Sequence, residues 1–121
     1  DYGQMERQAE LLVEAMINAA KADGRVDAEE QQKIVERLGE VSRDELEFVR
    51  RELAAPLDAQ GFIGRVPRGM ERDVYAVSLM AIDLDSNPEA HYLHQLAQGV
   101  GLSADACNEI HEALGAPKLY R

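Results

Sequence analysis

Two acid-rich segments, 23–30 and 83–89, carry the residues of this sequence that are most able to do chemistry. The first supplies four carboxylates within eight residues, and the second supplies three carboxylates and one asparagine amide oxygen. Hard cations such as Ca²⁺ and Mg²⁺ prefer several oxygen ligands, carboxylates above all. If the two segments lie at the same end of a folded domain, their carboxylates could form one shared acidic site.

Neither segment is a complete EF-hand loop. In the first segment, Ala19 and Lys21 fall at loop positions that require oxygen ligands. In the second, Pro88 stands where a glycine is needed, and His94 stands where the bidentate glutamate should be. Neither segment can therefore bind Ca²⁺ as an EF-hand loop.

Helix capping explains part of the acid-rich pattern without any metal. Asp27 with Glu30, and Ser86 with Glu89, have the spacing of capping boxes, in which polar side chains accept hydrogen bonds from a helix start. Capping leaves three acids unexplained, because they fall where helices are expected to end and where negative charge is mildly unfavourable: Asp23, Asp83 and Asp85. We favour a structural role over a cation site, and a shared ion would require the Asp23 and Asp83 carboxylates to lie within about 12 Å.

The other reactive side chains form no recognisable catalytic motif. His91 and His94 are three residues apart on one helix face, where solvated histidines are commoner than metal ligands. Cys107 lies on an apolar helix face, which favours burial over nucleophilic chemistry. His111 and Glu112 lack the second histidine of a zinc-protease motif. A hydrolytic or redox enzyme is therefore the least favoured class.

The acid-rich segments are expected to join pairs of helices. Apolar residues recur at helical spacing through most of the chain, and glycines, prolines and capping patterns interrupt this period. The expected helices cover residues 6–22, 27–39, 42–56, about 68–84, 86–101 and 103–115, with one or two short helical turns after Asp58. No useful segment alternates with period two, so the predicted fold class is all-α, a compact bundle of six to seven short helices.

The composition fits one helical domain over residues 1–121. Apolar residues make up 45% of the chain and aromatic residues only 5%, a mixture that suits helix packing better than a sheet. The net charge of −10 would repel nucleic acid and anionic bilayers, and we read it as solubilising charge rather than as a device that recruits basic partners. The single cysteine excludes an intrachain disulfide, and the longest apolar run, 74–82, is too short to span a bilayer.

A weak repeat relates the two acid-rich segments. Asp23-x-x-x-Asp27-x-Glu29 and Asp83-x-x-x-Asn87-x-Glu89 have the same spacing, 60 residues apart, and the similarity decays downstream. This predicts a weakly duplicated helix–hinge–helix unit, in which each copy pairs a central apolar helix with an amphipathic one.

Residues 74–82, apolar nearly all round, should lie in the middle of the bundle, and Leu114 should lie on the buried face of the last helix.

The two acid-rich segments together resemble a known family. Ala-Lys-Ala-Asp-Gly-Arg-Val-Asp-Ala-Glu-Glu (20–30), followed by Ala-Ile-Asp-Leu-Asp-Ser-Asn-Pro-Glu-Ala-His-Tyr-Leu (81–93), resembles the TerB-like tellurite-resistance domains, and more closely their YebE-type branch of unknown function. The resemblance covers nearly the whole chain and implies an all-α fold of about seven short helices, with 58–65 as the additional one. It also implies acidic residues grouped at the hinges, which in TerB-like proteins are suspected of binding divalent metal. Carried over to this sequence, the resemblance implies the candidate metal ligands Asp23, Asp27, Glu30, Asp83 and Asp85.

The YebE-type branch usually carries an upstream glycine-rich or membrane-associated segment. The resemblance therefore implies that this chain is the C-terminal part of a longer bacterial protein that is associated with the membrane through that segment. The domain itself is expected to be soluble, in the cytoplasm or at the inner membrane, on a side that the sequence does not specify.

These observations favour a non-enzymatic binding or scaffold domain with an unknown protein partner and no nucleic-acid partner. A weak Ca²⁺ or Mg²⁺ site at the paired acid-rich segments is the functional hypothesis for the acids that capping leaves unexplained. The alternative is a pure protein-interaction module, in which the acids serve only as helix caps and solubilising charge. That alternative predicts an exposed apolar patch around Phe48, Phe62 and Ile63, which fit no buried helix face.

Overall fold

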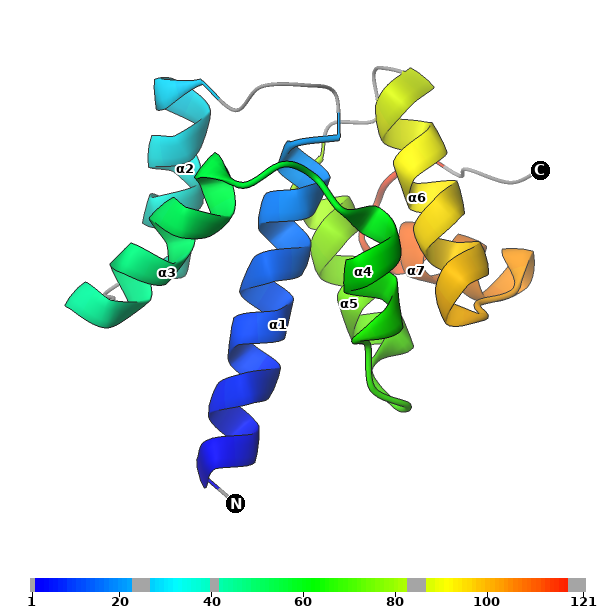
Figure 1. The fold of residues 1–121 in the computed structure, drawn as a ribbon. Coiled ribbons are helices and arrows are strands. Elements are labelled where there is room, and N and C mark those ends of the chain that lie inside the picture. The colour runs from blue at the N-terminus through cyan, green and yellow to red at the C-terminus, as the bar shows by residue number, and fades with distance from the viewer. Residues whose placement is uncertain (1, 23–26, 40–41, 83–86, 118–121) are drawn as a thin grey trace.

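The computed structural model describes residues 2–22, 27–39, 42–82 and 87–117 (Figure 1). Within these ranges the chain forms seven helices and no strand: α1 (Tyr2–Ala20), α2 (Ala28–Leu38), α3 (Arg43–Ala54), α4 (Ala59–Gly64), α5 (Glu71–Met80), α6 (Asn87–Val100) and α7 (Ala104–Ala113). The all-α prediction is confirmed, including the short helix after Asp58.

Capping residues determine where several helices start and end. Ser42, Asp58 and Ser103 precede α3, α4 and α7, and their side-chain oxygens accept hydrogen bonds from the backbone N–H three residues on, at 3.2, 3.0 and 3.1 Å. Each bond satisfies one of the N–H groups that a helix start leaves without a partner. At the C-terminal end of α6, Gly101 adopts a φ of 84°. The N–H of Leu102 then donates to the carbonyl oxygen of Ala97 at 2.9 Å, which ends the helix.

Helices α1 and α5 run side by side in the same direction at the centre of the bundle (Figure 1). The main apolar cluster joins them to α4, α6 and α7, and its fully buried members include Phe62, Val74, Tyr75, Leu93, Leu96 and Cys107. The buried residues that α1 contributes to this cluster are Ala15 and Ala19. Small side chains at a helix contact shorten the distance between helix axes, so they favour close packing of the two central helices.

A second, smaller cluster packs α2 and α3 against another side of α1. Its buried members are Ile17, Ile34 and Val49, one from each helix. Phe48 is only partly buried and packs against this cluster. Helix α1 therefore has two buried faces, and its remaining exposed side lies between α3 and the segment that links α4 to α5 (Figure 1).

The weak repeat extends further in space than in sequence. Helices α1, α2 and α3 correspond in order to α5, α6 and α7, and in each set the first helix packs against the other two. Ser42 and Ser103 cap the third helix of each set in the same way. The two predicted helix–hinge–helix units are the first two helices of these sets, α1 with α2 and α5 with α6. Helix α4 lies between the two sets in sequence and packs on α6.

Helix α5 is shorter than the sequence predicts. It was expected to begin at Arg68 or Gly69 but begins at Glu71, because Gly69 adopts a φ of 98° and turns the chain. It ends at Met80, since the next two N–H groups donate to carbonyls three residues back at 3.2 Å and tighten the last turn. The predicted end at Leu84 lies outside the described residues.

Burial inside the helices agrees with the prediction, and burial at two helix ends does not. Val74 and Tyr75 are completely buried, as a central helix requires, but Met80 at the end of α5 is 57% exposed. The prediction that Leu114 is buried was wrong, because α7 ends one residue earlier and His111 occupies the interior instead. In the described ranges, no helix has the length and apolar character needed to cross a membrane.

Candidate functional site

Most of the predicted cation ligands lie outside the described part of the chain. Asp23, Asp83 and Asp85 are outside it, and so is the side chain of Glu30, whose backbone belongs to α2. Asp27 is exposed and stands directly before α2, where its backbone carbonyl accepts the first helical hydrogen bond at 2.9 Å. Among the described residues, no group of three or more His, Cys, Asp or Glu side chains is placed to hold a metal ion.

The helix ends that flank the two acid-rich segments lie at the same end of the bundle (Figure 1). Helices α1 and α5 both end there, and α2 and α6 both begin there.

The histidines of α6 and the cysteine of α7 do not form a reactive site in the described chain. His91 is exposed and His94 is half-buried, and neither belongs to a described metal-binding group. Cys107 is completely buried, as predicted. Burial raises the pKa of the Cys107 thiol, which lowers the fraction of the nucleophilic thiolate.

His111, in contrast, has a defined structural role in the interior. Its Nδ1 lies 2.7 Å from the carbonyl oxygen of Pro117, and its Nε2 lies 2.7 Å from the Tyr75 hydroxyl. A carbonyl oxygen can only accept a hydrogen bond, so Nδ1 of His111 carries a proton and donates it to Pro117. His111 thereby joins the chain beyond α7 to the central helix α5.

The exposed apolar patch predicted around Phe48, Phe62 and Ile63 is not present. Phe62 is completely buried, and Ile63 packs so closely on α6 that a Cβ at Gly99 would lie 2.7 Å from its Cγ2 atom. The prediction was wrong because a helix of six residues is too short for its hydrophobic period to reveal which face is buried. Phe48 and Ile63 are both partly buried, and Phe48 lies at the wall of a groove.

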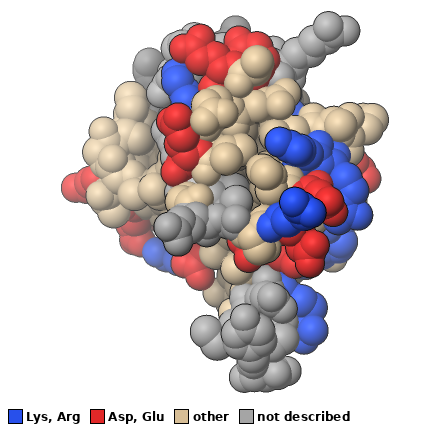
Figure 2. All heavy atoms as spheres, turned by 90° about the vertical axis from the view of Figure 1, so that its left-hand side faces the viewer, with Lys and Arg blue, Asp and Glu red and all other residues tan. Residues whose placement is uncertain are grey.

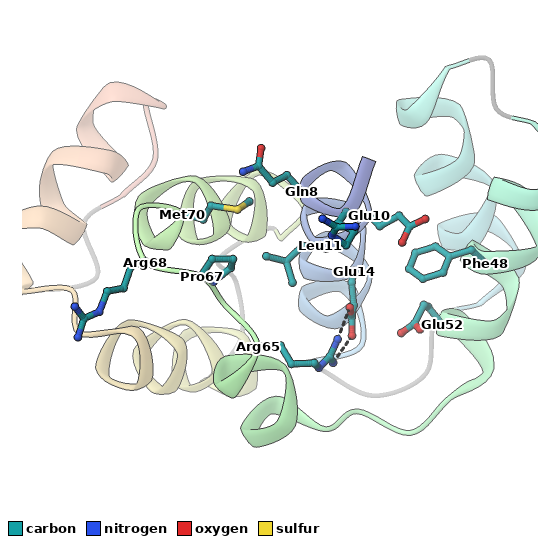
Figure 3. Close-up of a pocket in the computed structure, with 11 residues that line it drawn as sticks. Gln8, Glu10, Leu11, Glu14, Phe48, Glu52, Arg65, Pro67, Arg68 and Met70 are labelled. Carbon is teal, nitrogen blue, oxygen red and sulfur yellow. Dashed lines mark hydrogen bonds and ion pairs between the residues drawn. The ribbon is translucent and has the colours of Figure 1, made fainter. Parts of the chain in front are cut away.

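This groove, which we call the α1 groove, has a volume of about 500 Å³ and lies over the exposed side of α1 (Figure 3). Its floor consists of α1 residues at positions 7, 8, 10, 11 and 14, which share one helix face because they are three or four residues apart. Phe48 and Glu52 of α3 form one wall, and the segment 65–70 forms the other. Leu11, Pro67 and Met70 complete the apolar part of the lining.

A bidentate ion pair between Glu14 and Arg65 closes one part of the α1 groove (Figure 3). The two terminal nitrogens of Arg65 donate to the two carboxylate oxygens at 2.9 and 2.5 Å. The Glu14 side chain is only 11% exposed, so losing its partner would leave a carboxylate largely out of water. The hydrogen bond with Glu14 raises the pKa of Arg65. This pair holds the segment after α4 against α1.

Lys21 fixes the opposite wall of the groove. Its Nζ donates to the backbone carbonyls of Glu52 and Ala55, at 2.5 and 2.8 Å, where α3 ends. Carbonyls at a helix C-terminus lack helical partners and carry partial negative charge, so an ammonium group stabilises this end of α3. Burial lowers the pKa of Lys21, and the carboxylates of Glu52 and Glu14 oppose that shift.

Four charged side chains of the groove lining form no ion pair in the described part of the chain: Arg7, Glu10, Glu52 and Arg68. Glu10 and Glu52 lie on the α3 side, whereas Arg68 lies on the opposite side, beyond Pro67 (Figure 3). On the molecular face that α2 and α3 occupy, acidic and basic side chains are interspersed (Figure 2). Within the groove, negative charge therefore lies on the α3 side and the positive charge of Arg68 on the opposite side, whereas both signs of charge are mixed on the surrounding surface.

Sequence reasoning missed the residues that build the α1 groove. A local signal was absent for Glu14 and Lys21, because the predicted apolar stripe of the first helix runs through positions 9, 12, 13, 16 and 20, and helical spacing places positions 14 and 21 outside it. No local signal existed for Arg65 either, since its contact with Glu14 joins positions 51 residues apart. Its role depends on how α4 packs.

The fold and the groove define a small all-α domain with an open, partly apolar groove on its central helix. Residues 1–114 match the family model described as "Protein of unknown function (DUF533)", and the chain belongs to this family. The family is related to the TerB-like proteins, as the acid-rich segments suggested. No similar curated protein and no similar solved structure was found.

Proposed function

We propose that this chain is a non-enzymatic protein-binding domain that engages its partner through the α1 groove. One observation carries the proposal: an open groove of about 500 Å³ lies on the central helix and combines apolar side chains with charges that lack ion-pair partners among the described residues. Surface hollows in which apolar side chains are mixed with a few polar groups are typical of binding sites.

The chemistry of the lining favours binding over catalysis. The described residues that line the groove carry carboxylates, guanidinium groups, one amide and apolar side chains, and among them there is no histidine, cysteine, serine or lysine. The most buried carboxylate, Glu14, is held by two hydrogen bonds from Arg65, so it is occupied as a structural ion pair rather than poised to accept a proton.

Photo-crosslinking from inside the groove tests this proposal. A photoreactive phenylalanine analogue at Gln8, which is exposed and lines the groove, is expected to crosslink the parent protein to a second protein in its native cells. The same analogue at Gln32, on the exposed face of α2, is the matched control and is expected to give no such product. Equal crosslinking from the two positions, or none from Gln8, would contradict a binding role for the groove.

A second candidate function is a weak divalent-cation site at the paired acid-rich segments. It is supported by the four described helix ends that flank these segments at one end of the bundle (Figure 1). The ligands proposed are Asp23, Asp27, Glu30, Asp83 and Asp85, with Ca²⁺ or Mg²⁺ as the cation, since both prefer carboxylate oxygens.

Calorimetric titration with Ca²⁺, Mg²⁺ and Mn²⁺ tests the cation site. Binding is expected to release or absorb heat and to raise the melting temperature, and the triple substitution D23N/D83N/D85N should remove both effects. The charge-matched control is the substitution of three exposed acids elsewhere, D44N/E47Q/E112Q, which should leave both effects intact. If wild-type protein shows neither heat nor stabilisation at millimolar metal, the site does not exist.

We also infer that the chain is a TerB-like domain of the YebE-type branch. The inference is supported by the two acid-rich motifs at residues 20–30 and 81–93 and by the relationship of the matched family to the TerB-like proteins. This placement would make the domain part of a bacterial scaffold or stress-associated protein, and it assigns no tellurite chemistry.

A further inference from the structure

Resting on the function proposed above, we infer that the occupant of the α1 groove is an amphipathic helix of a partner protein, with a basic residue on one flank of its apolar face and an acidic residue on the other. The inference names the chemistry and the orientation of the partner, which the proposed function leaves open.

The apolar groups of the groove are placed to receive one apolar helix face. Leu11 lies on the floor, Phe48 on the α3 wall and Pro67 on the opposite wall (Figure 3). Met70 also lines that opposite wall, but it is only 8% exposed and belongs mainly to the core. A helix lying between these walls can direct residues at positions i, i+3, i+4 and i+7 toward all three sides. The apolar contact would supply most of the affinity, because the surrounding charges are exposed to water.

The shape of the groove favours a helix over an extended peptide. The floor and one wall are themselves helices, α1 and α3, so a further helix can pack its side-chain ridges between theirs. An extended peptide usually binds by adding a strand to the edge of a sheet. The described part of this chain contains no strand and therefore offers no such edge.

The charges of the groove determine the orientation of the bound helix. Glu10 and Glu52 would attract a basic side chain on the flank that faces α3, and Arg68 would attract an acidic side chain on the opposite flank (Figure 3). Arg7, on the floor one turn before Leu11, lines the same groove and adds positive charge to it. Exposed pairs of this kind contribute little affinity, but reversing the order places like charges together and disfavours the wrong orientation.

Selection from a displayed peptide library tests the inference. The library consists of helices with a fixed leucine and phenylalanine face and randomised flanks, and it is selected on the full chain. Enriched peptides are expected to carry a basic residue on one flank and an acidic residue on the other, and to lose at least about tenfold in affinity for the groove-filling variant Q8W. The variant Q32W, which places the same side chain on exposed α2, should bind them as wild type does. Circular dichroism verifies that both variants fold.

Charge reversal in the groove tests the proposed orientation of the bound helix separately from the proposal that the groove is a binding site. Against E10R/R68E, the selected peptides should bind roughly two- to fivefold more weakly, and peptides with exchanged flank charges should bind more tightly. Q8W-sensitive peptides without any charge order would overturn the inference and leave the groove as a binding site. If no selected peptide is sensitive to Q8W, the helix inference fails, and the crosslinking from Gln8 decides separately whether the groove binds a protein.

Discussion

At the scale of single residues, the structure replaces one set of important charges with another. The sequence draws attention to Asp23, Asp83 and Asp85, which lie outside the described residues. The described charges with defined roles are Glu14, which pairs with Arg65, and Lys21, which binds the end of α3. These side chains are partly or largely buried, so their interactions cost more to lose than those of solvated surface pairs.

Lys21 is predicted to be necessary for holding α3 in place. The substitution K21M keeps the aliphatic stem but removes the ammonium donor from the carbonyls of Glu52 and Ala55, so that Glu52 keeps only the 3.3 Å hydrogen bond from the Ala55 N–H. We expect the free energy of unfolding, measured by urea denaturation, to fall by about 1–3 kcal/mol. The control K33M removes an exposed lysine of α2 and should change the stability by less than about 0.5 kcal/mol. Equal effects of the two substitutions would show that the Lys21 bonds do not stabilise the fold.

The buried thiol of Cys107 is predicted to make the free energy of unfolding decrease at alkaline pH. Burial raises the thiol pKa in the folded chain above its ordinary value of 9.0, so the unfolded chain loses its proton first as the pH rises. The unfolded state then binds fewer protons, and the free energy of unfolding falls as the pH increases through about 9.

The test compares melting temperatures of wild type and C107A between about pH 8 and pH 10. The wild-type melting temperature should fall more steeply, because alanine has no proton to lose. C107A is expected to be less stable at every pH because it leaves a small cavity, so the slope and not the absolute value is compared. Parallel pH profiles would contradict the prediction.

At the scale of elements, the arrangement depends on how closely particular helices approach. Helix α4 is only six residues long and would not be stable alone, so its position is determined by contact with α6 and by the Arg65 ion pair. Because α4 holds the segment 65–70, which forms one wall of the α1 groove, its packing controls the width of that groove.

The contact between α4 and α6 is predicted to require a glycine at position 99. In G99A the new Cβ would lie 2.7 and 2.8 Å from two carbon atoms of Ile63, which is too close without displacement of the helix. In G64A, by contrast, no atom lies within 4 Å of the new Cβ. Both substitutions remove a flexible glycine from a helix, so we expect G99A to be less stable than G64A by about 1–3 kcal/mol in thermal unfolding. Equal melting temperatures would mean that the two helices separate without cost.

At the scale of the whole molecule, two sets of three helices share one core through α1 and α5. The main cluster draws most of its large side chains from α4 to α7, whereas the first set contributes mainly alanines to it. The smaller cluster of Ile17, Ile34 and Val49 belongs to the first set alone. The two sets are therefore unequal in their capacity to fold independently.

We predict that the first set of helices, α1 to α3, unfolds when it is separated from the second. A fragment of residues 1–55 would retain only the small cluster and expose the α1 face that packs on α5. Such a short chain buries too little apolar surface to offset its conformational entropy, so its circular dichroism signal should change gradually with temperature. Addition of the fragment 56–121 should restore a cooperative transition. A sigmoidal melting curve for 1–55 alone would refute this dependence.

The sequence alone determined the helical class, most helix boundaries and the short helix after Asp58. These features follow from hydrophobic period, capping residues and glycines, which act over a few neighbouring positions. It also predicted the burial of Cys107 on the inner face of α7. Where the local signal was short or near a helix end, as for Phe62 and Leu114, the prediction was wrong.

The tertiary structure alone decided which charged residues meet and where the chain has an open groove. Glu14 and Arg65 are 51 residues apart, and Lys21 reaches carbonyls 31 and 34 residues away, so no local pattern connects them. The groove exists because α2 and α3 cover one side of α1, α5 covers another, and the segment after α4 stops short of α3. Such a space depends on the relative placement of whole helices, and that placement is set by packing over the entire core rather than by any stretch of sequence.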